Sequence, residues 1–97
     1  MKTVNLEVTG VDSSRAISVD YNHNDFKVGL GITVTGTATY TVEHSFDDPD
    51  EATVWFPHPD LTDKTGTEDG NYAYPIRQIR VTNTIGTGTT TLRVVFS

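Results

Sequence analysis

No cysteine occurs among the 97 residues of the sequence. Disulfide bonds, thiolate metal sites and cysteine nucleophiles are therefore excluded, and the fold must be held by packing and by hydrogen bonds between strands. Long hydrophobic runs are missing too, since no stretch approaches the roughly 20 apolar residues that cross a membrane. The first residues also lack the apolar core of a secretory signal. We expect a soluble protein that is made in a reducing cytoplasm and has no membrane partner.

Basic residues are scarce: the chain has 7 Lys and Arg against 13 Asp and Glu, and its formal net charge is −6. Nucleic-acid binding needs clustered basic side chains that replace the counterions of the phosphates, so nucleic acid is not an expected partner. The charges are also segregated, because acidic residues gather between positions 47 and 70, whereas residues 71–97 hold three arginines and no acid. Such a molecule could dock its acidic loop on a basic patch of a protein partner or of a second copy.

One stretch organises the chain: from Phe26 to Phe46 apolar and aromatic residues occupy even positions, and His44 is the one polar member of that series. A period of two places these side chains on one buried face of a β-strand and the intervening threonines on a wet face. A single straight strand of this length would measure about 65 to 70 Å, which is too long. Gly36 is the expected pivot, either of a hairpin or of one strand that bends and enters two sheets. We favour the bend, because the alternation keeps its phase across Gly36.

Further short strands are expected on either side of this stretch. Alternation predicts strands at residues 2–8, 15–21, 53–56, 75–84 and 90–96, with a bulge near Arg77 and Gln78. Residues 60–71 read as a loop anchored by Leu61, and residues 84–89 as a glycine-bearing hairpin loop. No segment has helical apolar spacing with capping signals. The sequence therefore predicts one all-β domain over residues 1–97, a β-sandwich or jelly roll of about six to eight mostly antiparallel strands.

The sequence gives little indication of a catalytic site or a metal site. The acidic run at residues 47–51 offers oxygen ligands for calcium, but it lacks the alternating spacing of a known calcium loop. His44 and His58 could act as bases beside Asp47 or Asp48, yet no serine lies in a nucleophile motif. An inward histidine on a strand is more often a hydrogen-bonded core residue. We expect no catalytic residue, no metal and no cofactor.

Aromatic residues beside loops are better candidates for a binding surface, because tryptophan and tyrosine are over-represented at protein interfaces. Trp55 has an alternative role as a cap on the core, whereas alternation places Tyr72 and Tyr74 on one face. Glu43 could pair across strands with Arg77 or Arg80. The candidate interface residues are Trp55, Phe56, Tyr72 and Tyr74, together with the acidic residues Asp47, Asp48, Asp50 and Glu51.

Three segments carry a resemblance to a known group of proteins. They are GTATYTVEHSFDD at residues 36–48, VWFPHPDLTDKTGTEDGNYAYPIRQIRV at residues 54–81 and TLRVV at residues 91–95. Their order and spacing resemble small virion proteins of tailed bacteriophages, in which a similar Tyr-Thr-Val strand precedes a Trp-Phe segment, a Pro-Ile-Arg strand and a closing strand. The resemblance covers most of the chain from about Gly29 onward.

The resemblance implies a structural role in the virion and no enzymatic activity. The expected role is that of a head decoration or cement protein that binds the major capsid protein or another virion protein, as a symmetric homo-oligomer such as a dimer or trimer. Two alternatives stay open: a carbohydrate-binding or host-recognition module, and a tail or head-to-tail connector component.

Overall fold

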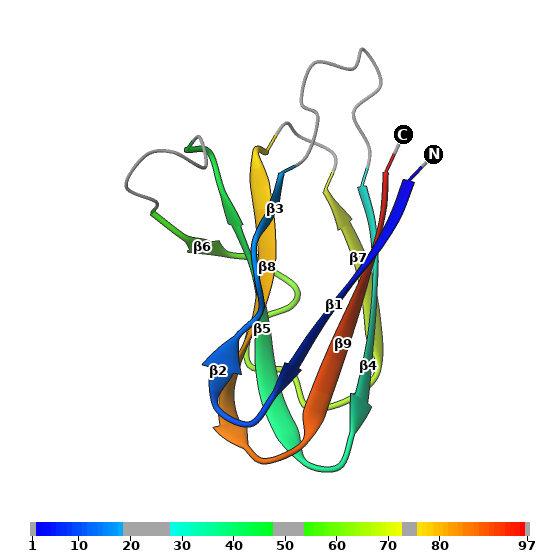
Figure 1. The fold of residues 1–97 in the computed structure, drawn as a ribbon, viewed down its shortest axis with the longest axis vertical. Coiled ribbons are helices and arrows are strands. Elements are labelled where there is room, and N and C mark those ends of the chain that lie inside the picture. Colours follow the sequence, from blue (N-terminus) through cyan, green and yellow to red (C-terminus); the bar gives the residue numbers. More distant parts are fainter. Residues whose placement is uncertain (1, 19–27, 48–53, 73–75, 97) are drawn as a thin grey trace.

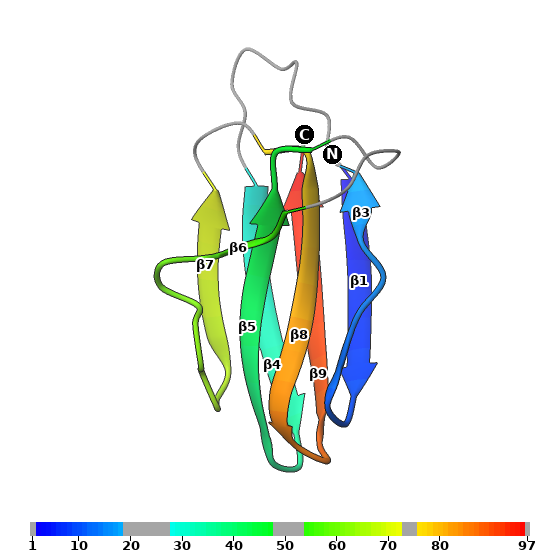
Figure 2. The ribbon, with the colours of Figure 1, turned by 90° about the vertical axis from the view of Figure 1, so that its left-hand side faces the viewer.

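The computed structural model describes residues 2–18, 28–47, 54–72 and 76–96. These residues form two antiparallel sheets packed face to face and no helix, so the expected all-β sandwich is confirmed (Figures 1 and 2). Sheet A consists, in spatial order, of β1 (Lys2–Thr9), β9 (Thr89–Phe96), β4 (Val28–Thr35) and β7 (Glu68–Tyr72). Sheet B consists of β2 (Asp12–Ser13) and β3 (Ile17–Ser18), which pair with β8 (Gln78–Gly86), then β5 (Ala38–Ser45) and β6 (Phe56–Pro57).

The core follows the predicted alternation. Leu30 and Ile32 of β4 and Tyr40 and Val42 of β5 point between the sheets and are almost fully buried. The prediction is wrong at Phe46, which is 48 % exposed because β5 ends one residue earlier. Phe26 lies outside the described residues. Leu6, Val8, Val81, Leu92 and Val94 complete the centre of the core from the neighbouring strands.

Three tight turns at one end of the sandwich carry the chain from one sheet to the other: β1 to β2, β4 to β5 and β8 to β9 (Figure 1). The stretch around Gly36 therefore enters two sheets, as favoured, but the chain reverses there and does not merely bend. A two-residue hairpin within one sheet would pair Thr35 with Ala38 and shift the alternation, whereas a turn between sheets preserves it. The expected hairpin loop at residues 84–89 is likewise a turn between sheets, since β8 pairs with β5 and β9 with β1 and β4.

The three turns contact one another through backbone hydrogen bonds. The amide of Gly10 donates to the carbonyl of Gly88 at 3.1 Å, and the amide of Gly88 donates to the carbonyl of Thr37 at 2.9 Å. A Cβ at Gly88 would lie 2.7 Å from the carbonyl oxygen of Thr35 and 2.8 Å from the amide nitrogen of Thr37. Only glycine fits at this junction, because no real side chain tolerates backbone atoms at that distance.

Other boundaries differ from the sequence prediction. The expected loop at residues 60–71 ends in strand β7, which pairs with β4. The expected bulge at Arg77 and Gln78 lies instead opposite Thr39 and Tyr40, where the register between β5 and β8 shifts. Residues 53–56 contribute only the start of β6, and the strand expected at residues 15–21 is reduced to β3, with residues 19–21 outside the described part. Leu61 is a buried anchor, as expected.

The junction of the turns generates a stability prediction. Gly88→Ala should lower the free energy of unfolding by about 1–3 kcal/mol, because the added methyl group overlaps fixed backbone atoms. Gly66→Ala is the matched control, since a Cβ there meets nothing within 4 Å and the residue does not require a positive φ. The control should be neutral or more stable by about 0.4–1 kcal/mol. Urea unfolding of both variants measures the difference, and equal stabilities would contradict the steric argument.

Candidate functional site

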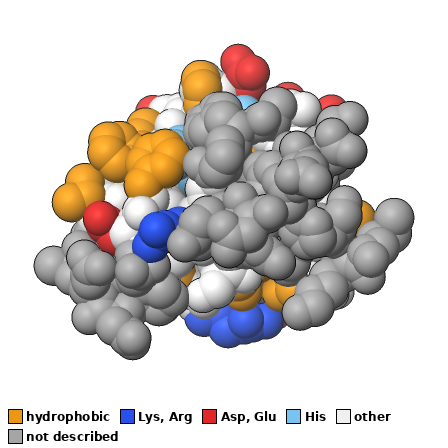
Figure 3. Space-filling model, turned by 90° about the horizontal axis from the view of Figure 1, so that it is seen from above, with side chains coloured by type: hydrophobic (Ala, Val, Ile, Leu, Met, Phe, Trp, Pro, Cys, Tyr) orange, Lys and Arg blue, Asp and Glu red, His pale blue; other side chains and the backbone are white. Residues whose placement is uncertain are grey.

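Exposed hydrophobic side chains gather at the edge of sheet B, beside β6. Phe46, Val54 and Phe56, which we call the aromatic corner, are 48 %, 59 % and 45 % exposed. The rings of Phe46 and Phe56 lie together, with centroids 5.6 Å apart. Seen from above, hydrophobic side chains form a cluster on the side of the molecule where β6 lies (Figure 3). Exposed apolar side chains gathered in one place make this edge the candidate contact surface of the described residues.

Two buried rings support the aromatic corner from below. The His44 ring packs edge-on against Phe46 at 5.3 Å and stacks on Phe56 at 6.0 Å between centroids. Its Nδ1 lies 2.8 Å from the hydroxyl of Tyr72, a strand-β7 residue in the opposite sheet. The exposed rings therefore rest on a hydrogen-bonded aromatic pair that joins both sheets, which fixes their positions.

The two described histidines belong to the interior, as the sequence interpretation of core histidines expects. His44 and His58 are both 4 % exposed. His58 Nδ1 accepts the amide hydrogen of Asp60 at 3.1 Å, so Nε2 carries the proton and donates to the carbonyl of Asn71 at 2.8 Å. Both ring nitrogens of His58 thus hold the chain between β6 and β7 in place. His23 lies outside the described residues.

Asp47 has a structural task beside the aromatic corner. Its Oδ2 accepts the amide hydrogen of Val54 at 2.8 Å, and its own amide donates to Ser45 Oγ at 3.0 Å. This carboxylate therefore ties the end of β5 to the segment that carries Phe56. The other acidic candidates, Asp48, Asp50 and Glu51, lie outside the described residues.

Trp55 lies on the outer face of sheet B next to the aromatic corner. The guanidinium carbon of Arg80 is 4.2 Å from the centroid of the indole, and Arg80 Nε donates to Glu43 Oε1 at 2.9 Å. The expected pairing of Glu43 with Arg80 is confirmed. Trp55 is half-buried, so it does not cap the core, and one face of its ring is covered by Arg80.

The structure corrects the assignment of Tyr72 to an interface. Tyr72 is 1 % exposed, because it lies opposite Val28 on the inward face of sheet A. Its hydroxyl is used by His44, so Tyr72 supports the aromatic corner without being part of its surface. Tyr74 lies outside the described residues. Of the predicted candidates, Phe56, Trp55 and Asp47 come together at one edge of sheet B.

Phe46 and Val54 are surface residues that the sequence pattern did not predict. Phe46 has the even phase of the core, so alternation alone assigned it to the interior. The signal that could have found it is the sequence Asp47-Asp48-Pro49 directly after it, since aspartate and proline are typical of the residues that follow a strand.

Comparison with known proteins adds no family to these observations. No family model matches the chain, and no curated protein sequence is significantly similar to it. Within the described ranges, no group of three or more His, Asp or Glu side chains could hold a metal ion. None of the described residues belongs to a helix long and apolar enough to cross a membrane. The aromatic corner and the sequence resemblance are therefore the observations that bear on function.

The histidine below the aromatic corner generates a pH prediction. Burial, with a smaller effect from His58, lowers the pKa of His44 below its usual 6.5. The unfolded chain therefore binds a proton more readily than the folded protein, so stability is lost as the pH falls below about 6.5. Between pH 7.5 and 5.5 the free energy of unfolding should decrease, by up to about 1.4 kcal/mol per pH unit once the pH is below 6.5.

Urea unfolding at several pH values measures this loss, and His44→Gln should reduce its slope. An NMR titration of the His44 ring protons in the unmodified protein gives the pKa directly. A His44 pKa at or above 6.5 would contradict the prediction even if the variant did not fold.

Proposed function

We propose that the protein is a non-enzymatic structural component of a tailed-bacteriophage virion, a decoration or cement protein that binds the major capsid protein. The observation that carries the proposal is the aromatic corner of Phe46, Val54 and Phe56. Protein interfaces concentrate their binding free energy in a few aromatic and arginine side chains at a rigid, desolvated centre. The corner offers such side chains in one place.

The surroundings of the corner match the same kind of interface. Trp55 and Arg80 stack at 4.2 Å beside it, and the Arg80–Glu43 pair supplies a polar rim. His44 and Tyr72 hold the exposed rings from below, so little side-chain freedom is lost on binding. A rigid contact of moderate strength is suited to a particle, where many copies act at once and avidity multiplies weak contacts.

The assignment to a virion comes from the sequence resemblance. Residues 36–48 and 54–81 carry that resemblance, and the same two segments supply the aromatic corner, its supporting His44 and Tyr72, and the neighbouring Trp55 and Arg80. The virion of the phage is accordingly the proposed location, reached after synthesis in the host cytoplasm.

A carbohydrate-binding role receives less support from the geometry. Sugar stacking needs an open aromatic face, whereas one face of Trp55 is covered by Arg80 and Tyr72 is buried. A tail or head-to-tail connector role would use the same protein-binding surface, but it differs in copy number. Protein staining of purified virions separates the two, since a head decoration protein is present in hundreds of copies and a connector in at most a few dozen.

The binding prediction concerns the two exposed rings. Phe46→Ser together with Phe56→Ser should weaken retention on capsids by at least about thirtyfold, because even one such anchor contributes about 2 kcal/mol or more. Ile85→Ser is the matched control: Ile85 is 65 % exposed, but it lies at the opposite end of sheet B, near the turn between β8 and β9. Co-sedimentation with capsids that lack the protein measures retention.

Circular dichroism should show the same strand signal in all three proteins, since every substituted side chain is exposed. Equal retention of the double variant and the control would reject the aromatic corner as the binding surface. Binding to a glycan array with quenching of Trp55 fluorescence, without binding to capsids, would favour the carbohydrate alternative.

A further inference from the structure

The outer face of sheet A carries two glycines that the fold itself does not explain. Gly29 and Gly31 of β4 alternate with the buried Val28, Leu30 and Ile32, so both face outward. A Cβ at Gly31 would meet nothing within 4 Å, and at Gly29 it would meet only the Val95 carbonyl, at 3.9 Å; neither residue needs a positive φ. Glycine weakens a strand interior and often marks a place where another backbone approaches closely.

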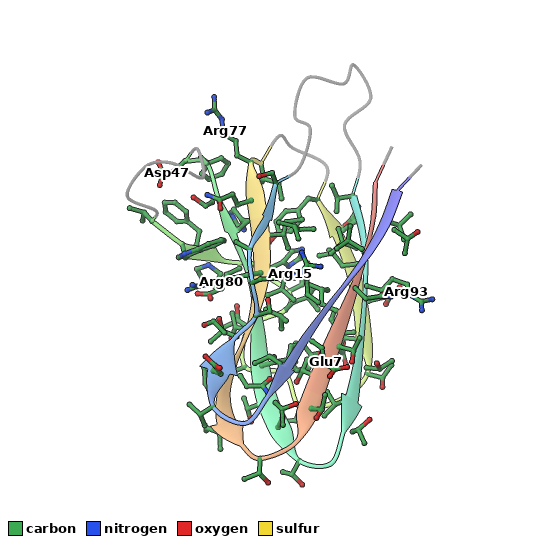
Figure 4. The ribbon with its side chains drawn as sticks, in the orientation of Figure 1. Glu7, Arg15, Asp47, Arg77, Arg80 and Arg93 are labelled. Atoms are coloured by element: carbon green, nitrogen blue, oxygen red, sulfur yellow. The ribbon has the colours of Figure 1, made fainter. Side chains whose placement is uncertain are left out.

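Opposite charges flank Gly31 on the two neighbouring strands. The register places Arg93 of β9 directly beside Gly31 on one side and Asp69 of β7 directly beside it on the other. Arg93 Nε donates to Asn5 Oδ1 at 3.3 Å, and neither Arg93 nor Asp69 forms an ion pair with another described residue. Figure 4 shows Arg93 directed away from the sandwich, on the side opposite Arg80.

The surface between these charges is low and polar. An open hollow of about 280 Å³ is lined by Gly31, Arg93 and the two threonines Thr33 and Thr91. Gly31 and the two threonines carry small side chains, so the backbone of β4 lies open between the longer side chains of Arg93 and Asp69.

We propose that this face binds a second copy of the chain, sheet A against sheet A, around a two-fold axis that runs parallel to β4 above Gly31. A half-turn about this axis carries β9 of one copy over β7 of the other. Arg93 of each copy then faces Asp69 of the second copy, and the Gly31 residues meet at the axis. The same patch is complementary to itself, as a closed dimer requires.

The charge pattern selects this arrangement over the alternative. A two-fold axis across the strands would place Arg93 over Arg93 and Asp69 over Asp69, which repel. The axis above β4 brings β9, β4 and the five-residue strand β7 into the contact and leaves β1 outside it, so strands about 4.8 Å apart give an overlapping face of about 300 Å² per copy. That area is smaller than in stable interfaces, so we expect a weak and transient dimer, with a Kd of about 100 µM or above.

Charge exchange between two variants tests the proposal. In sedimentation equilibrium from about 10 to 500 µM, the unmodified chain should dimerise, and Arg93→Asp and Asp69→Arg should each raise the Kd at least tenfold. Mixing the two variants should restore a heterodimer, because each aspartate at 93 then faces an arginine at 69 and each aspartate at 69 faces an arginine at 93. An unmodified chain that stays monomeric, or a mixture that does not associate, would overturn the proposal.

Gly31→Val provides an independent arm that separates packing from charge. Valine suits an exposed strand position, and its Cβ meets no atom of the same chain, so the melting temperature should be unchanged or higher. Dimerisation should nevertheless weaken, because the two added side chains meet at the axis and crowd the space between Arg93 of one copy and Asp69 of the other. A Gly31→Val dimer as tight as that of the unmodified chain would overturn the proposal. Phe46→Ser with Phe56→Ser should leave the dimer intact. The dimer and the capsid contact are therefore tested independently, and either proposal can fail without the other.

Discussion

The packing of backbone against backbone at Gly88 is the constraint on which the rest of the sandwich depends. Its amide and carbonyl link the turns around Thr37 and Gly10, and its missing side chain leaves room for Thr35 and Thr37. The junction fixes which side of each strand faces the other sheet at the point where the strand begins. The inward residues of β4 and β5 therefore face each other along both strands. Sheet pairing alone would not set that alignment, since the sheets share no ladder.

The strands that leave the three turns carry the aromatic corner at their far end. β5 and β8 are the two long strands of sheet B, and β5 delivers His44 to the interior and Phe46 to the surface within two residues of its end. His44 reaches Tyr72 in the other sheet, so the exposed rings are tied to both layers of the core. A surface built in this way keeps its shape without a partner, which is what a strong contact from few residues requires. The stability of the core and the geometry of the aromatic corner are therefore parts of one packing arrangement.

Much of the fold could be predicted because alternation reports burial directly, and Tyr40, Val42 and Leu92 occupy the interior as their phase requires. The errors have physical causes. Strand β7, with the sequence EDGNY, is an edge strand held by pairing with β4, so it needs few apolar residues and leaves little trace in the sequence. Phe46 is at an even position like the buried residues, but it follows the last residue of β5. Alternation predicts burial only within a paired strand, so it fails at Phe46. The aromatic corner forms where β5 pairs with β6, far from the three turns. The sequence therefore predicted Phe56 and Trp55 as surface residues, but it did not predict that Phe46 and Val54 lie beside them.

The two surfaces proposed for binding lie on opposite sheets, so both contacts could form on one molecule. The aromatic corner lies at the edge of sheet B and is apolar, whereas the outer face of sheet A around Gly31 is polar, so the two proposed partners would not compete for one surface. A dimer formed through sheet A would direct two aromatic corners outward from one rigid body. Two linked contacts raise the apparent affinity far above that of each contact alone, provided the spacing of the sites on the partner matches. In that arrangement the proposed dimer and the proposed capsid contact would stabilise each other on a lattice whose sites match the spacing of the two aromatic corners.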